Sequence, residues 1–357
     1  MTINTYKRDN LTKEEQLEII SQVEKQFSYL WDENFDRSIF LKCKDNFKNT
    51  KHIKSISILQ QNLKTQPKFT IAIPTYKRVD ELLRALHSAI EQKYNEDYEI
   101  LIIENLDNFN DDTLEKILRK NYSERINYYK NQSNLGMVGN WNRCLELAQG
   151  EWVCLLHSDD AIMPDYLDEI SKITDHPIYK KAALIGTSVK ATKTKLKHKF
   201  FHALLGSLWY KDPLECTDLY KQKKQSLKLK YIPPNGLLHN KKICLEKGGY
   251  SLDDYPTLDQ IFANRLLFNG EKIYTYKEKA LQIKFPDVST EGLPKTMLQY
   301  AFIDPIFYFA FMQNKTLAKE NIHKHLHFIQ EILKEKNCHI ISDYIQNRIL
   351  SHHFMLD

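Results

Sequence analysis

The sequence lacks several features that would place it in other protein classes. No two of its six cysteines form a C-x-x-C pair, so a zinc site is not expected. No run approaches the roughly 18 apolar residues of a transmembrane helix, and the N-terminus has no apolar core of a secretory signal. Neither an internal repeat nor a low-complexity linker is visible. The scattered cysteines are typical of free thiols, so we expect the protein in the reducing cytoplasm.

The sequence also lacks a strong charge of either sign. It has 51 basic and 46 acidic residues, a net charge of +5, and no recognition motif accompanies its lysines. Nucleic-acid binding is therefore not expected. With 357 residues, 42% of them hydrophobic and 27% charged, the composition is typical of a folded globular protein. The length fits one large α/β domain with additions, or two domains.

Strand-like and helix-like segments alternate between residues 68 and 172. The first kind is short, apolar and often β-branched, whereas the second carries apolar residues three and four positions apart. This alternation predicts an α/β fold with a mostly parallel sheet flanked by helices. The expected strands cover residues 69–74, 98–105, 126–131 and 151–157, and the expected helices cover 79–92, 111–122, 140–150 and 164–172.

Polar residues follow the predicted strands, and ligands bind at the carboxyl ends of strands in such sheets. These residues are Pro74-Thr75-Tyr76, Glu104-Asn105 and His157-Ser158-Asp159-Asp160. Adjacent carboxylates repel each other, so we expect a positive group beside Asp159 and Asp160. Mg2+ and Mn2+ prefer oxygen ligands and are often held by carboxylates together with substrate phosphates. The alternative is that the two acids start a loop or cap the following helix.

Residues 68–172 resemble the nucleotide-binding half of a family 2 glycosyltransferase with the GT-A fold. The resemblance is carried, in order, by "FTIAIPTYKRVDELLRALHSAIEQ", "YEILIIEN", "NLGMVGNWNRCLELAQGEWVCLLHSDD" and "MPDYL". The later segments "NGLLHNKKICLEKGGYS" and "TLDQIFANRLLFNGEKIY" are similar to the acceptor half of that family. We therefore expect a Rossmann-like GT-A domain with helical extensions. The predicted regions are an N-terminal extension (1–66), a nucleotide-sugar-binding half (67–180), an acceptor-binding half (181–290) and a C-terminal helical region (291–357).

The resemblance implies a donor site at the strand ends. Pro74, Thr75 and Tyr76 would line the base and ribose pocket, with the Tyr76 ring packed on the base. Arg78 would lie near the base or the diphosphate. Glu104 stands where the family usually has an aspartate that binds the base, and the alternative is a solvated strand end.

The same resemblance extends to the next loop and helix. Asn134 and Gly136 begin an N-x-G loop that would close over the nucleoside, and Gly139 and Asn142 would lie at the start of the following helix. Trp141 replaces an arginine that is frequent in the family, which leaves a donor contact at that position open.

The metal motif of the family, Asp-x-Asp-Asp, reads His157-Ser158-Asp159-Asp160 here. The resemblance implies that Asp159 and Asp160 form the metal site, with Asp159 as the essential ligand, and that Ser158 belongs to the donor site. The first position usually contacts ribose. A neutral imidazole at His157 can also donate or accept a hydrogen bond there, and metal ligation by His157 is the alternative.

Transfer with inversion requires a carboxylate that removes the proton of the acceptor hydroxyl. The family places it at the start of a helix after a Gly-Gly-aromatic segment, and "KGGYSLDDYPTLDQ" puts Asp259 there, preceded by Leu258 instead of glutamate. Asp253 and Asp254 are alternatives, and Asp259 could instead cap the helix 259–268. Arg265 is either an ion-pair partner or a diphosphate contact.

Two lysine-rich segments cover residues 190–210 and 221–230, and the first ends in an apolar-aromatic run. The lysines either solvate an exposed strand while the apolar run packs in the core, or bind an anionic membrane surface. In the second case the protein would lie at the inner face of the membrane.

The resemblance as a whole implies a metal-dependent inverting glycosyltransferase. The default donor is a UDP-sugar, with dTDP- and GDP-sugars open, and the acceptor is a glycan or a lipid-linked oligosaccharide of surface polysaccharide biosynthesis. The alternative, suggested by Trp141, His157 and Leu258, is a non-catalytic GT-A-like module that binds nucleotide or glycan in an assembly complex. For the terminal regions, acceptor docking, partner binding and self-association are open, and we favour a homo-oligomer formed through the C-terminal helices.

Overall fold

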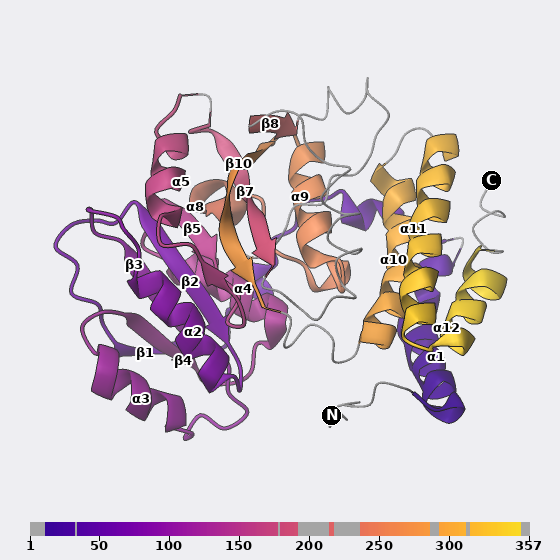
Figure 1. The fold of residues 1–357 in the computed structure, drawn as a ribbon, viewed down its shortest axis with the longest axis horizontal. Helices are drawn as coiled ribbons and strands as arrows, with labels where there is room; N and C mark the ends of the chain where they lie inside the picture. The colour runs from indigo at the N-terminus through magenta and orange to yellow at the C-terminus, as the bar shows by residue number, and fades with distance from the viewer. Residues whose placement is uncertain are drawn as a thin grey trace.

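The computed structural model describes residues 11–32, 34–177, 179–191, 214–217, 236–285, 293–311 and 315–350. Within these residues the central feature is one sheet of ten strands in the order β1-β4-β3-β2-β5-β9-β7-β10-β6, with β8 paired to β10. Figure 1 shows helices on both faces of this sheet and a separate group of helices beside it.

The bounds of the elements follow the chain order. The strands are β1 (Ser55–Leu59), β2 (Phe69–Thr75), β3 (Glu99–Glu104), β4 (Asn127–Asn131), β5 (Trp152–Leu155), β6 (Ala161–Ile162), β7 (Ala182–Ala191), β8 (Leu214–Thr217), β9 (Leu237–Asn240) and β10 (Lys272–Lys284). The α-helices are α1 (Lys13–Phe27), α2 (Val79–Ile90), α3 (Thr113–Tyr122), α4 (Gly136–Leu147), α5 (Tyr166–Thr174), α8 (Lys241–Glu246), α9 (Leu258–Phe268), α10 (Leu293–Phe311), α11 (Lys315–Glu335) and α12 (His339–Tyr344). The short 3-10 helices used below are η3 (Phe47–Asn49) and η5 (Leu252–Asp254).

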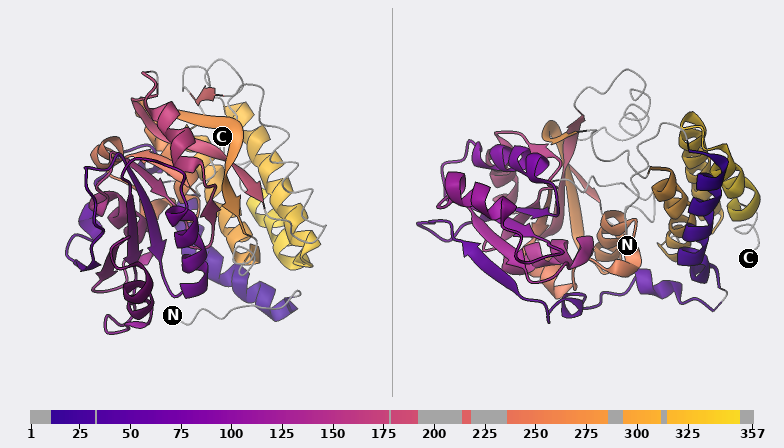
Figure 2. Two further views of the ribbon diagram at one scale, coloured as in Figure 1. Left: turned by 60° about the vertical axis from the view of Figure 1, so that its left-hand side comes forward. Right: turned by 90° about the horizontal axis from the view of Figure 1, so that it is seen from below.

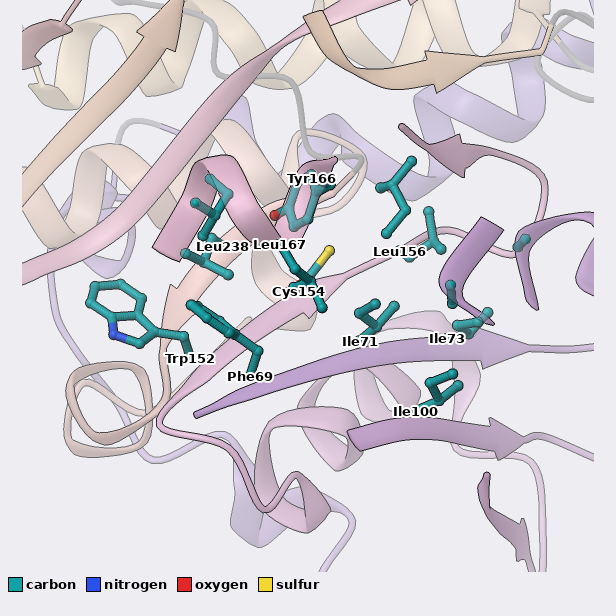
Figure 3. Close-up of a cluster of buried hydrophobic side chains, with 14 of the residues drawn as sticks. Phe69, Ile71, Ile73, Ile100, Trp152, Cys154, Leu156, Tyr166, Leu167 and Leu238 are labelled. Carbon is teal, nitrogen blue, oxygen red and sulfur yellow. The ribbon is translucent and has the colours of Figure 1, made fainter. Parts of the chain in front are cut away.

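The strands β4, β3, β2 and β5 are parallel neighbours, which confirms the predicted sheet. Every residue of β2 is buried, as its continuous apolar run requires. Successive side chains point to opposite faces of a strand. Phe69, Ile71 and Ile73 pack in a core with α2, α3 and α5, whereas Ala72 packs on the other face with α4 and α9. Figure 3 shows the first of these cores, with Trp152 of β5 beside β2.

The strands β9, β7, β10 and β6 complete the sheet on the other side of β5. β9 pairs antiparallel with β5 and β7, and β7 pairs parallel with β10. The end of β10 then pairs with the short strand β6, through Gln282 opposite Ile162 and Ile283 opposite Ala161. Because β6 follows Asp160 directly, this pairing brings the last residues of β10 to the predicted metal motif.

Two local expectations were wrong. Residues 55–59 belong to the N-terminal extension, which was expected to be helical, but they form β1, which pairs antiparallel with β4 at the edge of the sheet. Their backbone gains partners from a strand more than sixty residues away, which local periodicity does not report. The helix expected from residue 140 begins at Gly136 and ends at Leu147. Gly150, the last residue of the expected helix, lies outside it. A Cβ atom at Gly150 would lie 2.7 Å from the backbone of β2, so glycine is required by close packing.

The two ends of the chain form one helical bundle. α1 begins with a capping box formed by Thr12 and Glu15. Its buried residues share a core with those of α10, α11 and α12, and Figures 1 and 2 show these helices side by side. No helix of the described part of the chain is long and apolar enough to cross a membrane. The division at residues 66, 180 and 290 stays a prediction.

The lysine-rich segments cannot be placed on this fold. Apart from residues 190 and 191, which end β7, the segment 190–210 lies outside the described residues, as does 221–230.

Candidate active site

The site lies where β2, β3 and β5 end at one edge of the sheet. Thr75 is paired with Glu104 in the last row of β2 and β3, and the backbone N–H of Asn105 donates to the carbonyl of Thr75 at 2.9 Å. The chain leaves β5 at Leu155, and His157 follows two residues later. Parallel neighbours therefore bring all three predicted polar segments to the same edge.

Three potential ligand side chains gather after β5. One nitrogen or oxygen from each of His157, Asp159 and Asp160 lies within 4.8 Å of the others. In the described part of the chain, no other group of three or more such side chains is this close. One imidazole nitrogen and two carboxylates form a donor set suited to Mn2+ or Mg2+. These residues therefore fit a divalent cation.

Cationic side chains lie beside these acids, where the sequence analysis expected a divalent cation. Arg78 forms an ion pair with Asp159, with 3.0 Å between Nη1 and Oδ2. Arg84, from α2, donates to the backbone carbonyl of Asp159 at 2.8 Å and lies over the ring of Phe285. Asp160 is buried and accepts the backbone N–H of Phe285 at 3.0 Å. Burial and the charge of Asp159 raise the pKa of Asp160 to about 6.

Two departures from the family pattern contact each other. The rings of Trp141 and His157 stack with centroids 5.1 Å apart and an interplanar angle of 21°. Trp141 also meets the edge of Tyr250 at 5.2 Å. Burial lowers the pKa of His157 to about 4, although Asp159 opposes this shift. The imidazole is therefore neutral at neutral pH and keeps a nitrogen lone pair for a cation or a hydroxyl group.

A carboxylate that was not predicted joins two donor-site loops. Asp107 accepts from the Tyr76 hydroxyl at 2.8 and 2.9 Å and from the Asn134 side chain at 3.2 Å. Lys77 completes this cluster with an ion pair to Asp107 at 2.5 Å, and the lysine bond lowers the pKa of Asp107 to about 2. Its one signal in the sequence is its place three residues after a strand end. Asp107 fixes Tyr76 relative to Asn134.

The residues at the end of β3 are held from inside the sheet. Glu104 is buried and accepts a hydrogen bond from Tyr128, which excludes a solvated strand end. Burial raises the pKa of Glu104 to about 6. Asn105 accepts the N–H of Leu135 at 3.2 Å and donates to the carbonyl of Gly136 at 3.0 Å. It therefore positions the N-x-G loop, a role that the sequence analysis missed.

The remaining predicted donor residues divide into two groups. Pro74, Thr75 and Ser158 are buried at the strand ends. Asn142 connects α4 to the distant segment 248–250 instead, because its amide exchanges two hydrogen bonds of 2.9 Å with the backbone of Tyr250. The structure therefore does not bring Asn142 to the strand ends.

Asp259 lies in the first turn of α9 and is partly buried. Thr257 occupies the N-cap, so the alternative that Asp259 caps this helix was wrong. Burial raises the pKa of Asp259 to about 6, whereas the backbone N–H groups of Asp259 and Gln260 lower it. A carboxyl with this pKa is well suited to accept a proton near neutral pH.

The two alternative aspartates have other partners. Asp254 is fully buried and forms an ion pair with Arg265, which also donates to the carbonyl of Phe40 at 3.0 Å. Arg265 is therefore an internal ion-pair partner. Asp253 is exposed at the surface and pairs with Lys44 at 3.8 Å.

Lys284, at the end of β10, connects the two acidic parts of the site. Its positive charge lowers the pKa values of His157, Asp160 and Asp259, although burial is the largest influence on each. One ammonium group therefore lies within electrostatic reach of both the predicted metal motif and the predicted base. No motif in the sequence pointed to this lysine.

Comparison with known proteins gives the family. Residues 70–198 match the family model "Glycosyl transferase family 2". The abequosyltransferase RfbV of Salmonella typhimurium is 34% identical over 101 residues, which are 28% of this chain and 30% of that protein. The GalNAc(5)-diNAcBac-PP-undecaprenol beta-1,3-glucosyltransferase of Campylobacter jejuni is 35% identical over 107 residues, or 29% of this chain and 33% of that protein. The chain thus spans about a third of the length of these relatives.

A solved structure extends the likeness to the fold. The mannosyltransferase PcManGT from Pyrobaculum calidifontis, in complex with GDP-Man and Mn2+, aligns with a TM-score of 0.51 at 13% identity. The alignment covers 92% of this chain and 85% of that one. This likeness confirms the predicted GT-A fold. Residues 70–198 therefore form a glycosyltransferase family 2 domain, and this is a family of transferase enzymes.

Proposed function

We propose that this protein is a metal-dependent, inverting glycosyltransferase. It transfers a sugar from a nucleotide-sugar, by default a UDP-sugar, to a glycan or a lipid-linked acceptor in surface polysaccharide biosynthesis. The observation that carries the proposal is the juxtaposition around Lys284. The positive charge of this lysine acts both on His157 and Asp160, which cluster with Asp159, and on Asp259.

Each acidic group has a distinct chemical task in the proposed reaction. Asp259 takes the proton from the acceptor hydroxyl while its oxygen bonds to the anomeric carbon of the donor. The bond between that carbon and the diphosphate oxygen breaks, and the nucleoside diphosphate leaves with the bonding electrons. His157, Asp159 and Asp160 would hold a divalent cation, which neutralises negative charge on the diphosphate. Arg78 and Lys284 supply further positive charge at the same place.

The names of the relatives support the acceptor class. One is an abequosyltransferase and another acts on a sugar chain linked to undecaprenyl diphosphate. The family resemblance makes uridine the default base. The structural neighbour binds GDP-Man, so guanine is the second candidate, and thymine is tested beside them.

The proposed function is tested by melting the protein with UDP, GDP, dTDP and CDP, each with and without Mn2+. A ligand that binds only the folded state adds about 2.7 kcal/mol to the free energy of unfolding at 100 times its Kd, and it thereby raises the melting temperature. We expect a shift for one nucleotide that requires Mn2+. Absence of a shift for every nucleotide would contradict the donor site, and a shift without turnover of any sugar donor would favour the non-catalytic module.

The proposed base gives a pH prediction. Burial raises the pKa of Asp259 to about 6, and only the deprotonated carboxylate accepts a proton. We therefore expect kcat/KM to fall about tenfold for each pH unit below about 6. Above about pH 6 the ionisation of Asp259 should no longer change kcat/KM. The measurement is the initial rate of nucleoside diphosphate release across this range. A profile that is flat through pH 6 would contradict the assignment of Asp259.

A further inference from the structure

A pocket of about 260 Å³ opens beside the N-terminal end of α4. It lies between the N-terminal segment 46–50, the start of α4, and the segment 250–255. Its lining includes Asn49, Thr50, Met137, Tyr250, Leu252 and Tyr255. None of the described residues that line the pocket carries a charge.

Exposed apolar side chains gather at this pocket. Leu252 is 69% exposed and Met137 is 47% exposed, although both are large hydrophobic residues. They come from separate segments and line the same space. Such a gathering of exposed apolar groups marks a binding surface. Tyr250 and Tyr255 add aromatic rings, which combine an apolar face with a polar edge.

The polar groups of the lining are neutral. Asn49 and Thr50 supply an amide and a hydroxyl group, both of which donate and accept hydrogen bonds. Recognition of a phosphate or a carboxylate relies on arginine or lysine side chains, which the named lining lacks. A ligand with apolar faces, several hydroxyl groups and no charge therefore matches the pocket best. A sugar ring has this chemistry.

The N-terminal segment 46–50 forms one wall of the pocket and is held against the segment 248–249. The backbone N–H and the side-chain amide of Asn46 both donate to the carbonyl of Gly248 at 3.0 Å. Gly249 has a φ of +68°, and a Cβ atom there would lie 2.6 Å from Oδ1 of Asn142 and 2.7 Å from Cζ of Phe47. Only glycine allows this approach. The N-terminal segment is thus a fixed wall, which reduces the cost of ordering the pocket when a ligand binds.

Two ring contacts connect the pocket to the candidate active site. Tyr250 contacts Trp141, whose ring stacks on His157 of the metal motif. Tyr255 lies four residues before Asp259 in the sequence, and the charge of Asp259 reaches Tyr250, where it adds to the effect of burial in raising the pKa. A ligand in the pocket would therefore contact Tyr250 and Tyr255, which connect it to Trp141 and to the segment that precedes the proposed base.

We propose that this pocket binds a neutral sugar ring of the acceptor, and that the N-terminal segment 46–50 takes part in selecting that ring. The proposal rests on the proposed function for the identity of the ligand as an acceptor. The existence of the saccharide site is tested independently of any donor.

The test uses methyl glycosides of glucose, galactose, mannose and N-acetylglucosamine as probes, with binding to the full chain measured by saturation-transfer NMR. We expect at least one probe to bind the wild type. The double substitution Met137→Ala and Leu252→Ala should weaken that binding by about tenfold or more, because it removes apolar contacts from the pocket. Both side chains are largely exposed, so the melting temperature should stay close to that of the wild type.

Leu17→Ala is the matched control, because Leu17 is a 48% exposed leucine on α1, outside the pocket. This variant should bind the probes as the wild type does. The proposal is overturned if none of the four glycosides binds the wild type, or if the double variant binds equally well. Binding of a glycoside that depends on the pocket, in a protein that binds no nucleotide, would support the saccharide site and contradict the proposed function.

Discussion

Replacing Asp259 by asparagine should lower the rate of sugar transfer by about 10²- to 10⁴-fold, the range expected for loss of a general base. Asparagine has nearly the same shape, and its carbonyl can still accept the backbone N–H groups that approach Asp259. Its amide cannot take up the proton of the acceptor hydroxyl. The melting temperature and the Mn2+-dependent nucleotide shift should therefore be retained. The measurement is nucleoside diphosphate release with the donor that the melting screen selects.

Asp253→Asn is the matched control for this substitution. The Asp253 side chain is 54% exposed and pairs with Lys44 at 3.8 Å, and such surface pairs contribute about 0–1 kcal/mol. Its activity should stay close to that of the wild type. Asp254→Asn is a poor control, because it would disrupt a buried ion pair with Arg265 and with it the fold. Full activity in Asp259→Asn together with a large loss in Asp253→Asn would show that the base was assigned to the wrong aspartate.

The parallel half of the sheet could be predicted because its signals are local. β2 and β3 are short apolar runs, and α2 carries its buried residues three and four positions apart. Once the strands are parallel neighbours, the convergence of Thr75, Glu104 and His157 follows from the geometry of the sheet. This part of the site required no knowledge of distant contacts.

The parts that were missed depend on contacts between distant segments. β1 becomes a strand because the open edge of β4 offers it hydrogen-bond partners. Lys284 reaches the metal motif because β10 pairs with β6 over its last residues. The bundle joins α1 to helices near the other end of the chain. Neither periodicity nor turn chemistry within a short window contains this information, so the sequence alone did not predict these contacts.

The contact between Trp141 and His157 changes how two departures from the family pattern are interpreted. Along the sequence, Trp141 left a donor contact open and His157 was either a ribose contact or a metal ligand, and together with Leu258 they suggested a non-catalytic module. In the structure their rings stack, and Trp141 is itself packed against Tyr250. A neutral imidazole beside an aromatic ring is a stable arrangement in a buried place, where a carboxylate would need a cationic partner. We infer that Trp141 and His157 hold each other in position, and this arrangement is consistent with a working site.

Asp159→Ala should abolish the Mn2+-dependent nucleotide shift and lower the transfer rate by about 10²- to 10³-fold, equivalent to about 3–4 kcal/mol of transition-state stabilisation. The substitution removes one of the three clustered ligand side chains and leaves Arg78 without its carboxylate partner. Asp159 is a sharper test than Asp160, because Asp160 also accepts the backbone N–H of Phe285. Loss of Asp160 would weaken the fold and the ligand set together.

Asp168→Asn provides the control for a lost carboxylate, since Asp168 is an exposed residue of α5 that pairs with Lys172. This variant should keep both the nucleotide shift and the activity.

The comparison between nucleotide binding with and without Mn2+ separates two roles of Asp159. If Asp159→Ala lost nucleotide binding equally under both conditions, its pairing with Arg78 would be the important contact. If binding was lost only where Mn2+ had strengthened it, the carboxylate would act through the cation. Unchanged, Mn2+-dependent binding in Asp159→Ala would mean that the cation is held elsewhere, and the proposed metal site would be wrong.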